Sequence, residues 1–197
     1  MQKLKHLLLS LLTPIQKFIQ RIGYIENNFT VEDVDYMADL CQAGDILGSY
    51  ESGRFTSMFI KGEYDHIAMV TDDMMVIEAV GDKFVDGKNV GGVRKVGLKE
   101  WIWKKNHIFI MRHNTYGVGT KASKSYYTLL GMSYDYTFDR GNQTMYCSEI
   151  PYVCYHTHDH YFLSNVQPHQ EILPIDYLSC TSLDLILDTR RSLRALR

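Results

Sequence analysis

Three residues that lie far apart in the sequence have side chains that together can break an amide bond. Cys147 carries a thiol, His66 an imidazole and Glu78 a carboxylate. A free thiol is only about 3% ionised at neutral pH, so a cysteine nucleophile needs a nearby base. An imidazole can take the thiol proton, and a carboxylate can fix the imidazole tautomer and stabilise its charge. The three residues are therefore a candidate nucleophile, general base and orienting acid.

A β-hairpin is predicted to bring His66 and Glu78 together. Two apolar segments flank the polar residues Thr71 to Asp73. If these residues form the loop, Val70 pairs with Met74, and counting outward puts His66 across from Glu78, with Cβ atoms about 5 Å apart. A two-residue loop would send the carboxylate to the opposite face. Taken without a third residue, the pair is more often an ordinary strand histidine and a solvated acid.

Cys147 is predicted to lie at the amino end of a helix. Proline is tolerated only in the first helical turn, so Pro151 places the helix start close to Cys147 or Ser148. The helix dipole and the unpaired backbone N–H groups there favour a thiolate and can face an oxyanion. Glu149, in the same turn, works against the thiolate. The remaining cysteines lack such a setting and are interpreted as structural: Cys41, Cys154 and Cys180.

Composition argues against several other classes of protein. The 197 residues include 21 basic and 23 acidic side chains, a formal net charge of −2, and no basic block that would hold nucleic acid. The four cysteines form no CxxC pair, which disfavours a zinc knuckle or a redox motif. The cluster His156, His158 and His160 lacks the acidic partner of the HExxH pattern and falls where a helix should end. Neither a metal nor a cofactor is predicted.

The elements that must position these residues indicate an α+β fold. Helices are expected over 31–40, capped by Thr30, over 120–130, ended by Gly131, and after Tyr146. Strands are expected at 45–49, 67–71, 75–80 and 108–112. This order of helices, antiparallel sheet and helices is typical of the α+β class.

Residues 1–22 have apolar side chains at steps of three and four, the period of one helix face. The stretch lacks the long apolar core and small-residue cleavage site of a signal peptide. It is interpreted as a docking helix, with a membrane-surface or export segment as the alternative. No apolar run approaches the roughly 20 residues that span a bilayer, so a soluble protein is expected, with the cytoplasm favoured.

Taken together, the ordered motifs resemble the permuted papain-like hydrolases of the NlpC superfamily, most closely the YiiX/YebB-like branch. In this order the histidine and the acid precede the cysteine, the reverse of papain. The matching segments, from about Cys41 to Asp188, are Ala43–Leu47, Tyr64–Val70, Val76–Val80, Gly92–Arg94 with Leu98, Leu130–Tyr136, Tyr146–Glu149 and Ile172–Pro174.

The resemblance implies a small antiparallel sheet or half-barrel packed against helices. It maps Cys147 onto the nucleophile, His66 onto the base and Glu78 onto the residue that orients the base. The predicted organisation is an N-terminal helical extension (1–40), the hydrolase domain (41–188) and a C-terminal tail (189–197). Tyrosines next to the motifs are expected to line the substrate groove: Tyr134, Tyr136 and Tyr146.

The resulting hypothesis is a cysteine hydrolase that cleaves a peptide-like amide, such as a cell-wall peptide, through a thioester. One alternative is a lipid-directed acyl hydrolase or acyltransferase with the same three residues, delivered to a membrane or cell wall by residues 1–22. Another is a binding protein that keeps the frame without turnover. The sequence chooses neither the substrate nor the oligomeric state.

Overall fold

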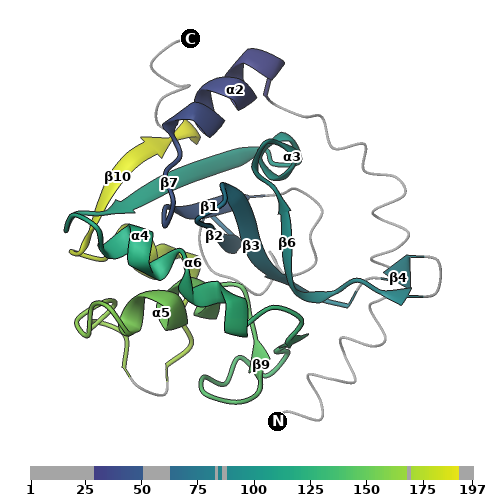
Figure 1. Ribbon diagram of the computed structural model, residues 1–197, viewed down its shortest axis with the longest axis vertical. Coiled ribbons are helices and arrows are strands. Elements are labelled where there is room, and N and C mark those ends of the chain that lie inside the picture. Colours follow the sequence, from purple (N-terminus) through teal and green to yellow (C-terminus); the bar gives the residue numbers. More distant parts are fainter. Residues whose placement is uncertain (1–28, 51–62, 83, 86–87, 168–169, 191–197) are drawn as a thin grey trace.

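An antiparallel sheet of six strands carries the fold of the computed structural model, which describes residues 29–50, 63–82, 84–85, 88–167 and 170–190 (Figure 1). The strand order is β10-β7-β1-β2-β3-β6. In chain order the strands are β1 (Ile46–Tyr50), β2 (His66–Val70), β3 (Met75–Val80), β6 (Gly92–Gly97), β7 (His107–His113) and β10 (Leu183–Asp188).

Short helices cover both faces of this sheet. They are α2 (Val31–Leu40), α3 (Leu98–Trp103), α4 (Val118–Ala122), the 3₁₀ helix η2 (Ser125–Thr128), α5 (Glu149–His156) and α6 (Pro174–Leu178). Two small strand pairs stand apart from the sheet: β4 (Phe84–Val85) with β5 (Lys88–Asn89), and β8 (Ser133–Tyr134) with β9 (Thr144–Met145). In Figure 1, α2 and α3 lie on one side of the sheet, and α4, α5 and α6 lie on the other.

The side chains of β2 alternate between two apolar clusters, as the period of two residues requires. Ile67 and Met69 pack in the cluster that includes residues of α4, η2, α5 and α6. Ala68 and Val70 pack in the cluster of α2 and α3. The sheet is therefore buried on both faces, and each helix layer has its own core.

Several predicted elements are confirmed. Helix α2 covers the expected range, and Thr30 forms a reciprocal cap with Asp33. The expected strands correspond to β1, β2, β3 and β7, each within a residue or two of its predicted ends. The α+β class is likewise correct, since antiparallel strands pack with helices.

The single helix expected over 120–130 is wrong, because the chain forms α4 and η2 instead. Ser123 breaks the helix: its hydroxyl donates to the Thr120 carbonyl at 2.9 Å, and its own carbonyl accepts the Asp72 backbone N–H at 3.3 Å. Side-chain bonds of this kind compete with helical ones. Helix α3 and strands β6 and β10 were not expected, and residues 1–22 lie outside the described residues. The division at residues 40 and 188 stays a prediction.

Helix α5 is tied to the start of the sheet at a point where glycines let the chains approach closely. Gly44 has φ +93°, and a Cβ atom there would lie 2.2 Å from the Gly119 carbonyl oxygen. The hydroxyl of Tyr155, on α5, donates to the Gly44 carbonyl. Gly44, just before β1, therefore helps to fix where α5 sits on the sheet.

Candidate active site

The hairpin of β2 and β3 brings His66 and Glu78 together, but not in the predicted register. Met69 pairs with Ile77, and the Thr71 N–H donates to the Met75 carbonyl at 2.9 Å. The pairing is thus shifted by two residues from the expected one, and His66 does not lie directly across from Glu78.

The physical reason is the turn. Its three loop residues are 72–74, one residue later than expected, and Met74 adopts a left-handed φ of 57°. A shift of two residues keeps each side chain on its own face, because strand side chains alternate with a period of two. The prediction that the imidazole and the carboxylate share a face is therefore confirmed, as a diagonal pair.

The imidazole and the carboxylate form a buried hydrogen bond. His66 Nε2 lies 2.8 Å from Glu78 Oε2, and the two residues are 3% and 2% exposed. An ionised carboxylate only accepts hydrogen bonds, so Nε2 carries the proton. In the neutral ring, Nδ1 is then the nitrogen with the lone pair. This is the tautomer that a general base at Nδ1 requires.

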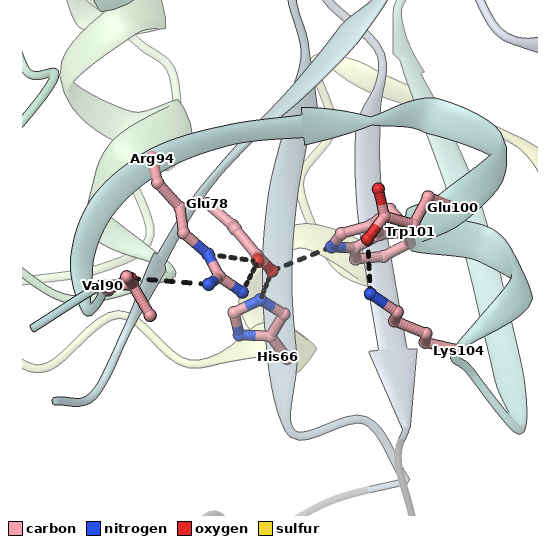
Figure 2. Close-up of polar contacts among 7 residues, drawn as sticks. All are labelled: His66, Glu78, Val90, Arg94, Glu100, Trp101 and Lys104. Carbon is pink, nitrogen blue, oxygen red and sulfur yellow. Dashed lines mark hydrogen bonds and ion pairs between the residues drawn. The ribbon is translucent and has the colours of Figure 1, made fainter. Parts of the chain in front are cut away.

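Two further residues hold the Glu78 carboxylate (Figure 2). Arg94 donates to Oε1 through both Nε (3.1 Å) and Nη2 (2.8 Å), and the Trp101 indole N–H donates to Oε2 at 2.9 Å. The Trp101 ring also lies 6.3 Å from the His66 ring, centre to centre. Donors on both oxygens favour the ionised form of Glu78, in opposition to the effect of its burial.

Sequence reasoning gave neither Arg94 nor Trp101 a role. Arg94 lies directly across from Glu78 in the pairing of β3 with β6, so opposite charges face each other across two neighbouring strands. That signal was present in the sequence, but β6 was not predicted. Trp101 comes from α3, a helix of six residues whose sequence LKEWIW shows little periodicity.

Cys147 lies just before α5, as expected from Pro151. Ser148 is the N-cap, so Pro151 is the third residue of the helix and sits in its first turn. The cysteine is buried at 4% exposure, and its sulfur lies 4.0 Å from the Ser148 hydroxyl. Helix α5 packs against β2 and β3, the strands that carry the histidine and the acid.

The arrangement limits where the thiol and the imidazole can meet. Helix α5 covers the face of Ile67 and Met69, whereas the His66 ring lies on the other face, beside Trp101. His66 is the first residue of β2. A meeting of Cys147 with His66 is thus expected past the end of this strand, not across a face of the sheet, and the approach of the sulfur to the ring stays a prediction.

Hydrogen bonds from distant segments fix the start of α5. The Tyr177 hydroxyl donates to the Ser148 carbonyl, and the Tyr146 hydroxyl accepts the Ile172 N–H at 3.0 Å. These bonds hold the residues on either side of Cys147. The backbone around the thiol is therefore positioned by the C-terminal part of the chain.

Glu149 is the acid predicted to oppose a thiolate at this helix start. It is 1% exposed; its Oε1 accepts the Gly141 N–H at 3.2 Å, and its Oε2 has no hydrogen-bond partner in the described part of the chain. Burial raises the pKa of Glu149 to about 7, with nearby Asp135 adding to the shift. Near neutral pH the carboxyl is thus protonated in about half of the molecules, which weakens its opposition to a thiolate.

The three tyrosines expected in the groove differ in exposure. Tyr134 and Tyr136 are partly exposed and pack edge to face at 4.9 Å, with the Asp82 N–H donating to the Tyr136 hydroxyl. Tyr146 is 1% exposed and packs on Phe138. Its position favours support of the helix start over contact with substrate, and a groove role for the other two stays a prediction.

The other cysteines are buried, as a structural role requires. Burial raises the pKa of both Cys41 and Cys154 to about 12, which leaves these thiols unreactive. In the described part of the chain, no group of three histidine, cysteine or acidic side chains is placed to hold a metal ion. His156 stacks on Tyr152 at 5.1 Å and meets His160 edge to face.

Comparison with known proteins agrees with this fold and this order of motifs. The model of the permuted papain-like amidase enzymes, the YaeF/YiiX or C92 family, matches residues 40–171. The chain belongs to this family of amidases.

A solved structure, titled as that of the metalloprotein YiiX from Escherichia coli O157:H7, is similar with a TM-score of 0.58 and 19% identity. The match covers 75% of this chain and 97% of YiiX, and it shows that the fold is shared. A search of curated proteins gave no significant match. Among the described residues, no helix has the length and apolar character to cross a bilayer.

Proposed function

We propose that the protein cleaves an amide bond of a peptide-like substrate, with Cys147 as nucleophile, His66 as general base and Glu78 as the residue that orients the base. The buried His66–Glu78 bond carries this proposal. It supplies an imidazole of defined tautomer next to a carboxylate that stays ionised, on strands against which the cysteine helix packs. Membership of an amidase family supports the reaction class.

The reaction follows from the chemistry of these three groups. His66 takes the proton of Cys147 at Nδ1, and the sulfur attacks the amide carbonyl carbon. The backbone N–H of Cys147, with a second donor, stabilises the oxyanion. The C–N bond then breaks, and the imidazolium protonates the leaving amine.

Water completes the cycle. His66 deprotonates a water molecule, which attacks the thioester, and the acid product leaves as the cysteine recovers its proton. Throughout, Glu78 stays ionised and stabilises the imidazolium without taking its proton. The substrate is proposed to be a peptide or another acyl amide, such as a cell-wall peptide.

Selective alkylation of the thiols tests the mechanism without knowledge of the substrate. At about pH 6, an unactivated thiol is almost fully protonated, so iodoacetamide should modify Cys147 well before the other cysteines. His66→Ala should abolish this preference. Cys154→Ser serves as the matched control and should leave it unchanged. Equal, slow labelling of all four cysteines would contradict the proposal and favour an inert binding protein.

Substrate class needs a second measurement. Acyl adducts trapped on Cys147 from a cell lysate and weighed by mass spectrometry should carry a peptide-like acyl group. Cys147→Ser should lose both the adduct and hydrolysis. A fatty acyl adduct would instead indicate the lipid-directed reaction, for which residues 1–22 would supply membrane contact.

A further inference from the structure

Arg94 is the part of the site with no assigned function. Its side chain is one-third exposed, while the Glu78 side chain that it contacts is 3% exposed. Both of its bonds to Glu78 go to Oε1, at 3.1 and 2.8 Å, and a third bond reaches the Val90 carbonyl at 3.4 Å. The guanidinium thus spans the distance from the buried acid to the β5–β6 turn at the surface.

The two oxygens of Glu78 have different partners. Oε1 accepts from Arg94, whereas Oε2 accepts from His66 and Trp101. Two N–H groups of the guanidinium converge on Oε1 and hold that oxygen in place, whereas the ammonium of a lysine would supply only a point charge. The fork of Arg94 therefore decides which oxygen faces the imidazole. Figure 2 shows the carboxylate enclosed by these three side chains.

The charge of Arg94 has a second effect. A permanent cation on the acid that stabilises the imidazolium opposes protonation of His66, and it favours ionisation of any thiol nearby. Glu100, on α3, interacts electrostatically with both Arg94 and Glu78. Glu100 is bound to Lys104 at 2.5 Å on the surface, and Lys105 lies over the Trp101 ring, 4.7 Å from its centre.

We propose that Arg94 is a positioning residue for the catalytic pair: its fork orients Glu78, and its charge sets the pH range over which His66 acts. The inference rests on the proposed role of His66 as general base. The inference predicts two separable effects of Arg94: one on how strongly the Cys147 thiol is activated, and one on how this activation depends on pH.

Substitutions at Arg94 separate these effects. The readout is the rate of Cys147 alkylation by iodoacetamide as a function of pH. Arg94→Gln removes the charge, so the midpoints of this profile should move upward by about one pH unit. Arg94→Lys keeps the charge but loses the fork, so its maximal rate should fall several-fold while the midpoints stay in place.

Lys95→Gln is the matched control. Lys95 is the next residue on β6 and points to the other face, where it binds Asp73 at 2.5 Å. The Lys95→Gln substitution removes one positive charge from the same strand. It should leave both the pH midpoints and the maximal rate of Cys147 alkylation unchanged. Circular dichroism and thermal unfolding verify that each variant is folded.

A purely structural role for Arg94 would lower stability and the maximal rate but leave the midpoints unmoved, and that result would overturn the inference. If Arg94→Gln does not fold, Arg94→Lys decides: a shift of its midpoints comparable to a full pH unit would contradict a role for the charge.

A second readout separates failure here from failure of the proposed function. If Cys147 proves unreactive in the wild-type protein, the imidazole signals of His66 can still be titrated by NMR, identified by their absence in His66→Gln. An upward shift of this titration in Arg94→Gln supports the inference even then. Identical titrations in the two proteins would overturn it.

Discussion

Glu78 and Glu149 are almost equally buried, yet the structure surrounds them with very different sets of hydrogen-bond donors. Glu78 is 2% exposed and accepts hydrogen bonds from His66, Arg94 and Trp101. Glu149 is 1% exposed and accepts one backbone N–H, with its second oxygen unpaired in the described structure. Burial alone therefore does not decide the charge of a carboxyl group. The charge also depends on the hydrogen-bond donors that surround the carboxyl group.

The comparison also separates two effects that a buried acid can have on the proposed chemistry. An ionised Glu78 stabilises positive charge on the base. An ionised Glu149, two residues after Cys147, would repel the negative charge of the thiolate, and its raised pKa of about 7 reduces this repulsion at neutral pH. The variants of Glu78, Glu149 and Trp101 below each test one side of this contrast, and a variant of Asp159 serves as a comparison outside it.

The largest effect is expected for Glu78→Gln. The amide keeps the size of the side chain but leaves the charge of Arg94 unpaired and gives the imidazole no anion. We expect unfolding free energy to fall by about 3 kcal/mol and selective alkylation of Cys147 to be lost. Denaturant unfolding and thiol labelling measure the two losses. Unchanged labelling would show that Glu78 does not support the base.

Glu149→Gln should change how stability depends on pH. A carboxyl whose folded pKa lies above its unfolded value binds more protons when folded, so wild-type stability falls as pH rises from about 4.5 to about 7 and then levels off. Above pH 7 the raised pKa of Glu149 lowers the free energy of unfolding of the wild-type protein by on the order of 3 kcal/mol. The Gln variant lacks this titration. Its stability relative to wild type should thus improve by that amount across the range, as measured by urea unfolding at several pH values.

A flat difference between Glu149→Gln and wild type over this range would contradict the raised pKa. Glu32→Gln is a suitable control, because this side chain is exposed in the first turn of α2. It should show no comparable change.

Trp101→Phe removes one donor from Oε2 of Glu78 and leaves the aromatic packing nearly intact. We expect a loss of about 1 kcal/mol, since other donors still satisfy the carboxylate. Thermal unfolding measures it. A loss as large as that of Glu78→Gln would mean that the indole contributes mainly through its packing in the α2 and α3 core.

The smallest effect on the site is expected at the second histidine–acid pair. His113 Nε2 lies 3.1 Å from Asp159, and its Nδ1 accepts the Thr115 N–H, so both ring nitrogens have structural partners. Asp159→Asn should cost about 1 kcal/mol and leave Cys147 alkylation unaltered. A loss of alkylation in this variant would show that the two pairs are coupled.

Sequence reasoning was strongest where local physics decides the outcome. The side chains of Thr30 and Asp33 each accept the backbone N–H of the other at the start of α2, and Pro151 limits where α5 can begin. The shared face of His66 and Glu78 was also accessible, because alternation survives an error of two residues in register.

The features that could not be predicted from the sequence depend on long-range contacts. The turn after β2 was placed one residue early because Met74, which adopts a positive φ, is an unusual residue for that conformation. Trp101 and Arg94 reach Glu78 only through α3 and β6, two elements that local patterns did not indicate. Strand β10 joins the sheet beside β7, far from it in sequence, and its pairing has no local signal.

The contact of Gly44 with Gly119 has a practical consequence for any mutational screen. A methyl group at position 44 would overlap the backbone of residue 119, and the relief of that clash would move the segment to which the Tyr155 hydroxyl is bound. Gly44→Ala would then tilt the helix whose first turn follows Cys147. Loss of turnover in such a mutant would look like a chemical defect, although its origin is an architectural one at a site with no reactive group.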